Sequence, residues 1–124
     1  MEPSVLVVDD EPMTRDLIRL MLQRVGFKVR EAEDGLDALR RVEADGVPDV
    51  FILDVMMPNM DGLTLCRELR QQDQTADTPI IMLSAKTAQT AVNEGLEAGA
   101  TKYLTKPIAR TELIENIKNV LGMA

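Results

Sequence analysis

The sequence predicts an α/β protein in which five parallel strands form one sheet that carries helices on both faces. Short, β-branched apolar runs alternate five times with longer segments whose apolar residues recur at helical spacing. Parallel strands need crossover connections, which are right-handed and place the intervening helices on the faces of the sheet. The 124 residues are 45% hydrophobic and contain no repeat or interdomain linker, so we expect residues 1–124 to form a single domain.

The expected strands span residues 4–8, 28–32, 50–53, 79–84 and 102–105. The first is a continuous apolar run, which is typical of a strand covered on both faces. The second is more polar and is expected near an edge of the sheet. The third leads directly into Asp54, which places this carboxylate at the end of a buried central strand.

The expected helices span residues 12–25, 35–44, 61–71, 90–98 and 110–121. Pro12 suits the first turn of a helix, and Gly26 suits the position just after one. The helix at 90–98 is the weakest, because Gly95 costs about 1 kcal/mol relative to alanine in a helix interior. The apolar side chains expected to form the helix stripes are Leu17, Leu20 and Met21, with Ile18, Leu22 and Val25 beside them; Leu36, Leu39 and Val42; Leu63, Leu65, Cys66 and Leu69; and Leu113, Ile114, Ile117, Val120 and Leu121.

Composition excludes several classes of function. The net charge of -7 and the aromatic content of 2% argue against direct binding to nucleic acid. The chain has no histidine, and its single cysteine, Cys66, excludes an internal disulfide and a thiolate metal cluster; we expect Cys66 to be a small buried apolar residue. No apolar run approaches the roughly 18 residues of a membrane span, so we expect a cytoplasmic protein without membrane contact.

Polar residues follow four of the five expected strands. They are Asp9 and Asp10 after the first strand, Asp54 after the third, Ser84 at the end of the fourth and Lys106 after the fifth. In a parallel sheet these positions share one edge, where open α/β folds bind ligands. Three carboxylates at one place repel each other, and an all-oxygen site of this kind favours Mg²⁺. With a lysine and a hydroxyl nearby, the site suits phosphoryl transfer to an aspartate, which would form an acyl phosphate.

Five motifs carry a family resemblance along the whole chain. They are Val-Val-Asp-Asp-Glu-Pro at 7–12, Asp-Gly at 34–35, Asp-Val-Met-Met-Pro-Asn-Met-Asp-Gly at 54–62, Leu-Ser-Ala at 83–85, and Gly-Ala-Thr-Lys-Tyr-Leu-Thr-Lys-Pro-Ile at 99–108. With these motifs the chain resembles the receiver domains of bacterial two-component response regulators. The resemblance implies a flavodoxin-like, doubly wound (βα)5 fold whose five-stranded parallel sheet has the order 2-1-3-4-5.

The resemblance also implies roles for the residues at the edge of the sheet. Asp54 would accept a phosphoryl group from a histidine kinase or a histidine-phosphotransfer protein. Asp10, Asp54 and the backbone carbonyl of Met56 would bind Mg²⁺ directly, and Asp9 would act mainly through water; Mn²⁺ would substitute for Mg²⁺. Lys106 would contact the phosphoryl group. The domain would thus catalyse its own phosphorylation and slow dephosphorylation without being a turnover enzyme.

A second group of implied roles concerns signalling. Ser84 would turn to hydrogen-bond the phosphoryl group, and Tyr103 would turn inward behind it. The surface formed by 90–98, 102–105 and 110–121 would then change and alter binding to a downstream protein. The peptide bond between Lys106 and Pro107 would be cis. Met56 and Lys86 stand at positions that tune phosphoryl lifetime in the family, and because Met56 has no group to orient a water molecule we expect slow dephosphorylation.

The chain departs from the winged-helix regulators of the family in one respect. Those regulators carry an acidic pair where Thr101 and Lys102 stand here, together with a basic final helix, and the final helix here contains Glu112 and Glu115. The ion pairs of their dimer are therefore not expected, and we expect a monomer or a weak dimer.

Three alternatives compete with the signalling switch. A phosphatase similar to haloacid-dehalogenase enzymes would carry a second aspartate two residues after the nucleophile, where this chain has Met56, and would place the nucleophile on the first strand. A phosphate-independent binding module with a vestigial site is disfavoured because all five polar site residues are present. A nucleotide-binding flavodoxin-like protein is disfavoured because no glycine-rich loop follows the first strand.

Overall fold

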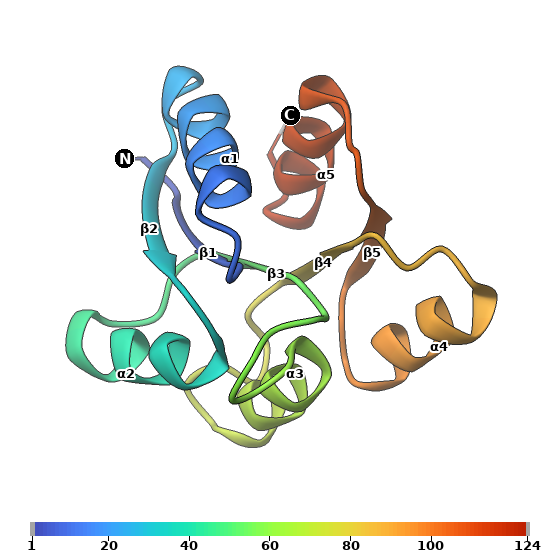
Figure 1. Ribbon diagram of the computed structural model, residues 1–124. Coiled ribbons are helices and arrows are strands. Elements are labelled where there is room, and N and C mark those ends of the chain that lie inside the picture. The colour runs from blue at the N-terminus through green and yellow to red at the C-terminus, as the bar shows by residue number, and fades with distance from the viewer. Residues whose placement is uncertain (1, 124) are drawn as a thin grey trace.

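The computed structural model describes residues 2–123, and strands and helices alternate along them (Figure 1). In chain order the elements are β1 (Ser4–Val8), α1 (Pro12–Arg24), β2 (Lys28–Ala32), α2 (Gly35–Asp45), β3 (Val50–Leu53), α3 (Gly62–Gln71), β4 (Ile80–Ser84), α4 (Gln89–Glu97), β5 (Lys102–Thr105) and α5 (Arg110–Val120). Where a predicted end differs, it differs by one residue; Asp61, for example, precedes α3 as its N-cap and accepts a hydrogen bond from the backbone N–H of Thr64. Within the described residues, none of the helices combines the length and the hydropathy that crossing a membrane would require.

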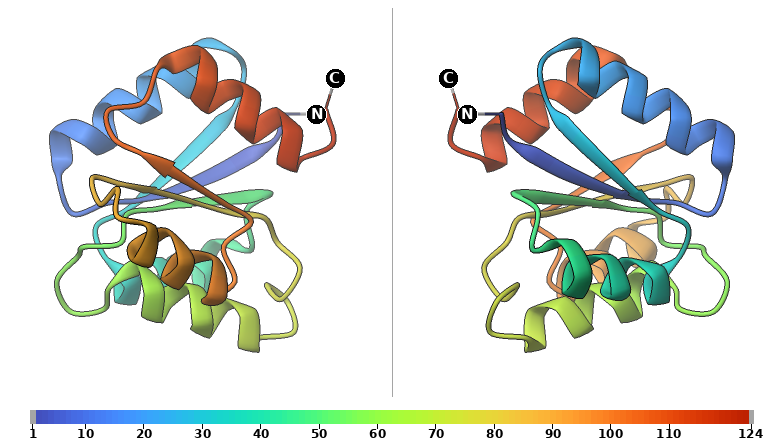
Figure 2. Two further views of the ribbon diagram at one scale, coloured as in Figure 1. Left: turned by 90° about the vertical axis from the view of Figure 1, so that its right-hand side faces the viewer. Right: turned by 90° about the vertical axis from the view of Figure 1, so that its left-hand side faces the viewer.

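The five strands form one parallel sheet with the order β2-β1-β3-β4-β5. This confirms the predicted flavodoxin-like topology, including the edge position of β2. Helices α1 and α5 cover one face of the sheet, and α2, α3 and α4 cover the other (Figures 1 and 2). Because the strands are parallel, their carboxyl ends meet at one edge, and this edge carries the site.

Side chains that alternate along the strands build a separate core on each face. The core under α1 and α5 contains Val5 and Val7 of β1 together with Ile18, Leu22, Leu113 and Ile117 from the two helices. The core under α2, α3 and α4 contains Leu6 and Val8 together with Ala38, Val42, Leu65, Cys66 and Leu69. Strands β1, β3 and β4 are therefore buried on both sides, which explains their unbroken apolar sequences. Cys66 is fully buried, as predicted.

Several predicted stripe residues face solvent instead. In α1, Ile18 and Leu22 are buried, but Leu17 and Leu20 are 56% and 52% exposed. Leu20 lies two residues, or about 200° of helix rotation, from Ile18 and therefore points away from the sheet. The same geometry turns Leu36 outward, because the buried line of α2 runs through Ala38 and Val42. An apolar face of α1 thus remains uncovered beside the functional edge.

Arg70 of α3 forms hydrogen bonds with the loops at the opposite end of the sheet. Its guanidinium donates hydrogen bonds to the carbonyl oxygens of Thr78 at 2.6 Å, Ala76 at 3.1 Å and Gly99 at 2.9 Å. These carbonyls belong to the connections that precede β4 and β5. The planar group of arginine can serve several acceptors at once, which an ammonium on a flexible stem does less well. One side chain therefore sets where β4 and β5 enter the sheet.

We predict that Arg70→Met lowers the free energy of unfolding by about 3 kcal/mol, because it leaves several partly buried carbonyls without donors. Arg67→Met is the matched control, since Arg67 is exposed on the same helix. Urea unfolding followed by circular dichroism measures both. Equal stability of the two variants would contradict the role given to Arg70.

Candidate functional site

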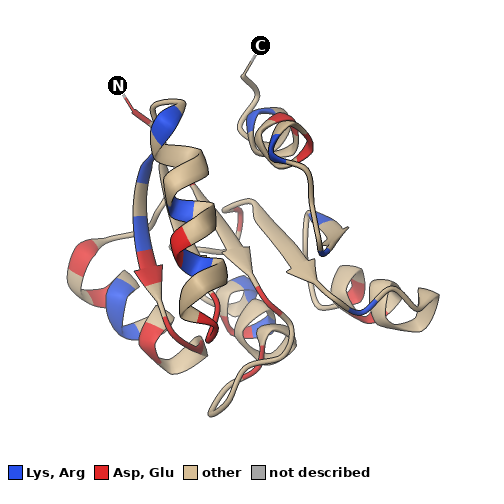
Figure 3. Ribbon diagram, turned by 45° about the horizontal axis from the view of Figure 1, so that its top comes forward, with Lys and Arg blue, Asp and Glu red and all other residues tan. Residues whose placement is uncertain are grey.

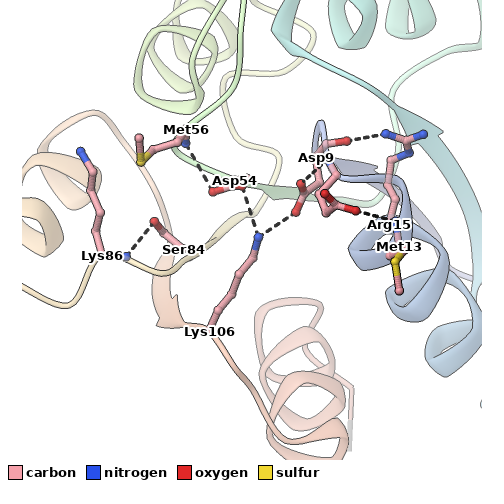
Figure 4. A network of polar contacts seen from close by, with 9 residues as sticks. Asp9, Met13, Arg15, Asp54, Met56, Ser84, Lys86 and Lys106 are labelled. Carbon is pink, nitrogen blue, oxygen red and sulfur yellow. Dashed lines mark hydrogen bonds and ion pairs between the residues drawn. The ribbon is translucent and has the colours of Figure 1, made fainter.

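Three strand ends bring Asp9, Asp54 and Lys106 into direct contact (Figure 4). The Lys106 Nζ donates hydrogen bonds to Asp9 Oδ2 at 2.9 Å and to Asp54 Oδ2 at 3.2 Å. The backbone N–H of Lys106 donates to the Ser84 carbonyl at 2.8 Å, which continues the pairing of β4 with β5. The Lys106–Pro107 peptide bond is cis. Residues that lie 52 and 97 positions apart in the chain from Lys106 therefore share its ammonium group.

Asp9 and Asp10 are neighbours in sequence but have different surroundings. Asp9 is only 2% exposed, and both of its carboxylate oxygens are engaged: Oδ1 accepts from the backbone N–H of Glu11 at 2.9 Å, and Oδ2 accepts from Lys106. Asp10 is exposed at the mouth of the site. The carboxylate of Asp10 is therefore the more accessible of the two.

Asp9, Asp10 and Asp54 form an acidic cluster that can hold a cation. One carboxylate oxygen from each lies within 4.8 Å of the other two. Acidic positions concentrate around the carboxyl ends of β1 and β2 (Figure 3), so the surroundings add negative potential. Oxygen ligands of this number and spacing fit Mg²⁺, which typically binds through one or two carboxylates and keeps several waters. The three predicted carboxylates are thus brought together by the fold.

Burial and neighbouring charges both shift the pKa values of Asp54 and Lys106. Burial raises the pKa of Asp54; the Lys106 charge acts against this rise, and the Asp9 charge adds to it. Burial alone would lower the pKa of Lys106, but the hydrogen bond with Asp9 and the charge of Asp54 raise it overall. Lys106 therefore stays charged, and the ionised form of Asp54 is disfavoured by its surroundings. A second cation nearby would stabilise the ionised form of such a carboxylate.

Ser84, Lys86 and Tyr103 form a chain of hydrogen bonds that leads away from Asp54. The Ser84 Oγ accepts from the backbone N–H of Lys86 at 3.2 Å, and the Tyr103 hydroxyl donates to the backbone carbonyl of the same Lys86 at 2.9 Å. The sequence predicted roles for all three residues but did not predict that hydrogen bonds link them in this order. Lys86 contributes through its backbone, which a sequence pattern of side chains does not reveal.

Gly95 has a packing role that its sequence context did not show. A Cβ atom at this position would lie 2.7 Å from the Tyr103 Cδ2 and 3.0 Å from the Met82 Sδ. The glycine therefore lets the ring of Tyr103 lie directly against α4. The sequence-based interpretation as a weak helix is incomplete, because the lost helix propensity accompanies a close contact that only glycine allows.

The contact between Asp34 and Asn59 was missed from the sequence. The buried Asp34 accepts hydrogen bonds from the backbone N–H of Asp37 at 2.8 Å and from the Asn59 Nδ2 at 2.7 Å. These bonds, the Asp37 bond first, hold the pKa of Asp34 below its usual value. Asn59 has a φ of 67° in the loop that carries Met56. Asp34 thus caps α2 and anchors this loop, but no local pattern links positions 25 apart.

Two surface grooves border the site. One is lined by Asp10, Met56, Met57 and Lys86, among others, and opens directly onto the acidic cluster. The Met56 side chain is 61% exposed there. The second groove runs between α1 and the start of α5; it is mostly apolar and is lined by Leu17, Met21, Lys106, Pro107 and Ile108, among others. Both grooves are therefore partly apolar.

Comparison with known proteins gives consistent matches. The model of the response regulator receiver domain family matches residues 5–118. The transcriptional regulatory protein CseB of Streptomyces coelicolor is 44% identical over 120 residues, which cover 97% of this chain and 50% of CseB. The chemotaxis protein CheY4 of Vibrio cholerae superimposes with a TM-score of 0.91 at 36% identity, covering 97% of this chain and 99% of that chain.

A third match is to a structure that contains a magnesium ion. The receiver domain of the sensor histidine kinase PA1611 of Pseudomonas aeruginosa, solved with a magnesium ion in its active-site cleft, has a TM-score of 0.90 and 33% identity over 98% of this chain and 99% of that chain. The solved receiver domains are thus matched over nearly their full length. By contrast, the chain spans about half the length of the curated relatives it matches.

Proposed function

Because this chain belongs to the response regulator receiver domain family, we propose that it is a phosphoryl-accepting switch of a two-component system, with Asp54 as the acceptor. The observation that carries this proposal is the joint contact of the Lys106 ammonium with Asp9 and Asp54 beside the accessible carboxylate of Asp10. A charged lysine within 3.2 Å of the acceptor can neutralise a phosphoryl oxygen as soon as the group arrives.

The residues at the site suit Mg²⁺ in the arrangement that the sequence suggested. Asp10 and Asp54, with the carbonyl of Met56, would hold the ion, and Asp9 would act through water because both of its oxygens already accept hydrogen bonds. When bound, Mg²⁺ would offset the charge shared by the carboxylates and the phosphoryl oxygens. The magnesium-bound receiver domain of PA1611 supports this assignment.

The transfer step needs no other protein group. A carboxylate oxygen of Asp54 attacks the phosphorus of a phosphohistidine, and the phosphorus–nitrogen bond breaks. The electron pair stays on the imidazole nitrogen, which then takes up a proton from water. Lys106 holds the Asp54 carboxylate before the reaction and contacts the phosphoryl group after it. The acyl phosphate that results is a covalent signal on the domain itself.

The phosphodonor is proposed to be a histidine kinase or a histidine-phosphotransfer protein that docks on α1. Met13, Leu17 and Leu20 leave apolar surface exposed on this helix, and the apolar groove next to them reaches Lys106. Exposed apolar surface of this kind marks protein contacts. A donor seated on α1 would therefore present its histidine beside Asp54.

Signalling is proposed to pass from Ser84 to the surface of α4, β5 and α5. If Ser84 turns to the phosphoryl group, its oxygen no longer accepts from the Lys86 N–H, and the backbone that holds the Tyr103 hydroxyl is released. The ring of Tyr103 packs against Gly95, so its movement reaches α4 directly. A downstream protein would bind this changed surface, and the net charge of -7 supports the proposal that the domain itself does not contact nucleic acid.

The phosphatase alternative gains no support. Its required second aspartate is replaced by Met56, which is exposed and has no proton to donate. The same residue is proposed to set a long phosphoryl lifetime together with Lys86, which faces it across the groove. The domain would thus complete its own phosphorylation and slow dephosphorylation without turning over a substrate.

The first prediction tests the acceptor. Acetyl phosphate with Mg²⁺ should add one phosphoryl group to the protein, and Asp54→Asn or removal of Mg²⁺ should abolish the adduct. Intact mass spectrometry measures it. Leu17→Glu is a control that separates chemistry from docking: it should keep the adduct from acetyl phosphate but slow transfer from a phosphohistidine protein about tenfold, which corresponds to about 1.4 kcal/mol of lost binding. A full adduct in Asp54→Asn would overturn the proposal.

The second prediction concerns lifetime. Met56→Asn should change the lifetime of the phosphorylated protein severalfold, because an amide at this position can orient the water that attacks phosphorus. Decay of the adduct after removal of acetyl phosphate gives the rate. Leu20→Asn is the control, since Leu20 is a similarly exposed apolar residue remote from the groove that Met56 lines. Identical lifetimes for wild type and Met56→Asn would contradict the role of Met56.

The third prediction concerns the switch. Phosphorylation should alter amide hydrogen exchange in α4 while leaving α3 unchanged. Tyr103→Phe should weaken this response, because it keeps the ring on Gly95 but removes the hydrogen bond to Lys86. Exchange measured by mass spectrometry on peptides from α3 and α4 tests both points. The switch would be refuted by exchange in α4 that does not respond to phosphorylation.

A further inference from the structure

Arg15 connects the acidic cluster to the edge strand of the sheet. From the first turn of α1, its Nη1 donates a hydrogen bond to the backbone carbonyl of Asp9 at 2.6 Å (Figure 4). Its Nε lies 3.5 Å from the Glu31 Oε1. The Arg15 side chain is 18% exposed, and that of Glu31 is 31% exposed. One guanidinium therefore joins the turn after β1 to the end of β2.

Glu31 pairs with Arg15 by charge, without a hydrogen bond between the two side chains. Its backbone pairs in register with Val7 of β1, and its second carboxylate oxygen lies 3.4 Å from the Arg19 Nε. The backbone of Glu31 is thus held in the sheet, and its carboxylate forms ion pairs with Arg15 and Arg19. Arg15 therefore links the Asp9 carbonyl, through its hydrogen bond, to a residue of the edge strand.

The Asp9 backbone is consequently held at both ends. Its N–H donates to the Ala32 carbonyl at 3.2 Å, and its carbonyl accepts from Arg15. The peptide group that carries this carbonyl also carries the N–H of Asp10. Fixing it therefore fixes the direction in which the chain enters Asp10, whose side chain is exposed.

We propose that Arg15 is a positioning residue of the metal site, which orients the carboxylates of Asp9 and Asp10 through the backbone carbonyl of Asp9. This inference rests on the proposed function, because it takes the acidic cluster to be a Mg²⁺ site. Arg15 makes its contact on the side of Asp9 away from Lys106 and does not touch the phosphoryl group. Arginine suits the role, because its planar group can donate to a carbonyl and pair with a carboxylate simultaneously.

Because Arg15 is positively charged, the direction in which Mg²⁺ affinity changes on its substitution tests the proposal. A cation near the cluster repels Mg²⁺, so removing this charge by itself would tighten Mg²⁺ binding. Loss of positioning would weaken binding instead. Supporting groups behind metal ligands typically change affinity about 10-fold or more when removed. The two effects have opposite directions and can be separated in one measurement.

The experiment is calorimetric titration of Mg²⁺ into the unphosphorylated protein. Arg15→Gln should bind about 10-fold more weakly than wild type. Arg19→Gln is the matched control, because it removes a charge that contacts the same Glu31 but not Asp9, and its affinity should stay within about twofold of wild type. Urea unfolding in EDTA records any loss of stability separately. Unchanged or tighter Mg²⁺ binding by Arg15→Gln would overturn the proposal.

Two further variants keep the test decisive. Arg15→Lys retains the charge but not the planar group, so it should also bind more weakly than wild type. If Arg15→Gln does not fold, Glu31→Gln replaces it: this change leaves Arg15 in place but removes its support, and Mg²⁺ affinity equal to wild type would then overturn the inference. Wild-type protein that binds no Mg²⁺ would refute the proposed function as well, whereas binding that is insensitive to these substitutions refutes only the role of Arg15.

Discussion

The repulsion among Asp9, Asp10 and Asp54 is the constraint on which the rest of the site depends. Burial raises the pKa of Asp54, and the charge of the neighbouring Asp9 adds to this rise. A single ammonium, that of Lys106, offsets two of the three. The remaining negative charge lies at the exposed Asp10, which makes the cluster receptive to a further cation. The site is therefore held in a state that a metal ion and a phosphoryl group would together complete.

The fold satisfies this constraint by fixing backbone positions rather than by adding charges. The parallel sheet brings the acidic residues to one edge, and Arg15 and Asp34 then anchor two loops that border the acidic cluster. Both anchors act through hydrogen bonds to main-chain atoms or to an adjacent loop. Electrostatic preorganisation of this kind costs little during a reaction, because the groups are oriented before it begins.

The contacts between Ser84 and α4 are also closely packed, so that a movement of Ser84 would be transmitted along them. Ser84, the backbone of Lys86 and Tyr103 are linked by consecutive hydrogen bonds, and the ring of Tyr103 meets α4 at a glycine. Close packing leaves no room for the ring to shift without moving a neighbour. In the proposed function, an event at Asp54 would reach a surface formed by α4, β5 and α5 through these contacts, and a phosphodonor would dock on α1 at the other side of the site.

The sequence by itself determined the fold class, the strands and the polar residues that gather at one edge, because alternating apolar runs specify a parallel sheet and a parallel sheet brings its strand ends together. It did not determine which way Leu17, Leu20 and Leu36 face, since apolar spacing alone does not say where a helix meets the sheet. Only the tertiary structure decided the roles of Arg15, Asn59 and Gly95. Their partners lie in other loops and elements, often through backbone atoms, and such contacts leave no periodic signal in a chain.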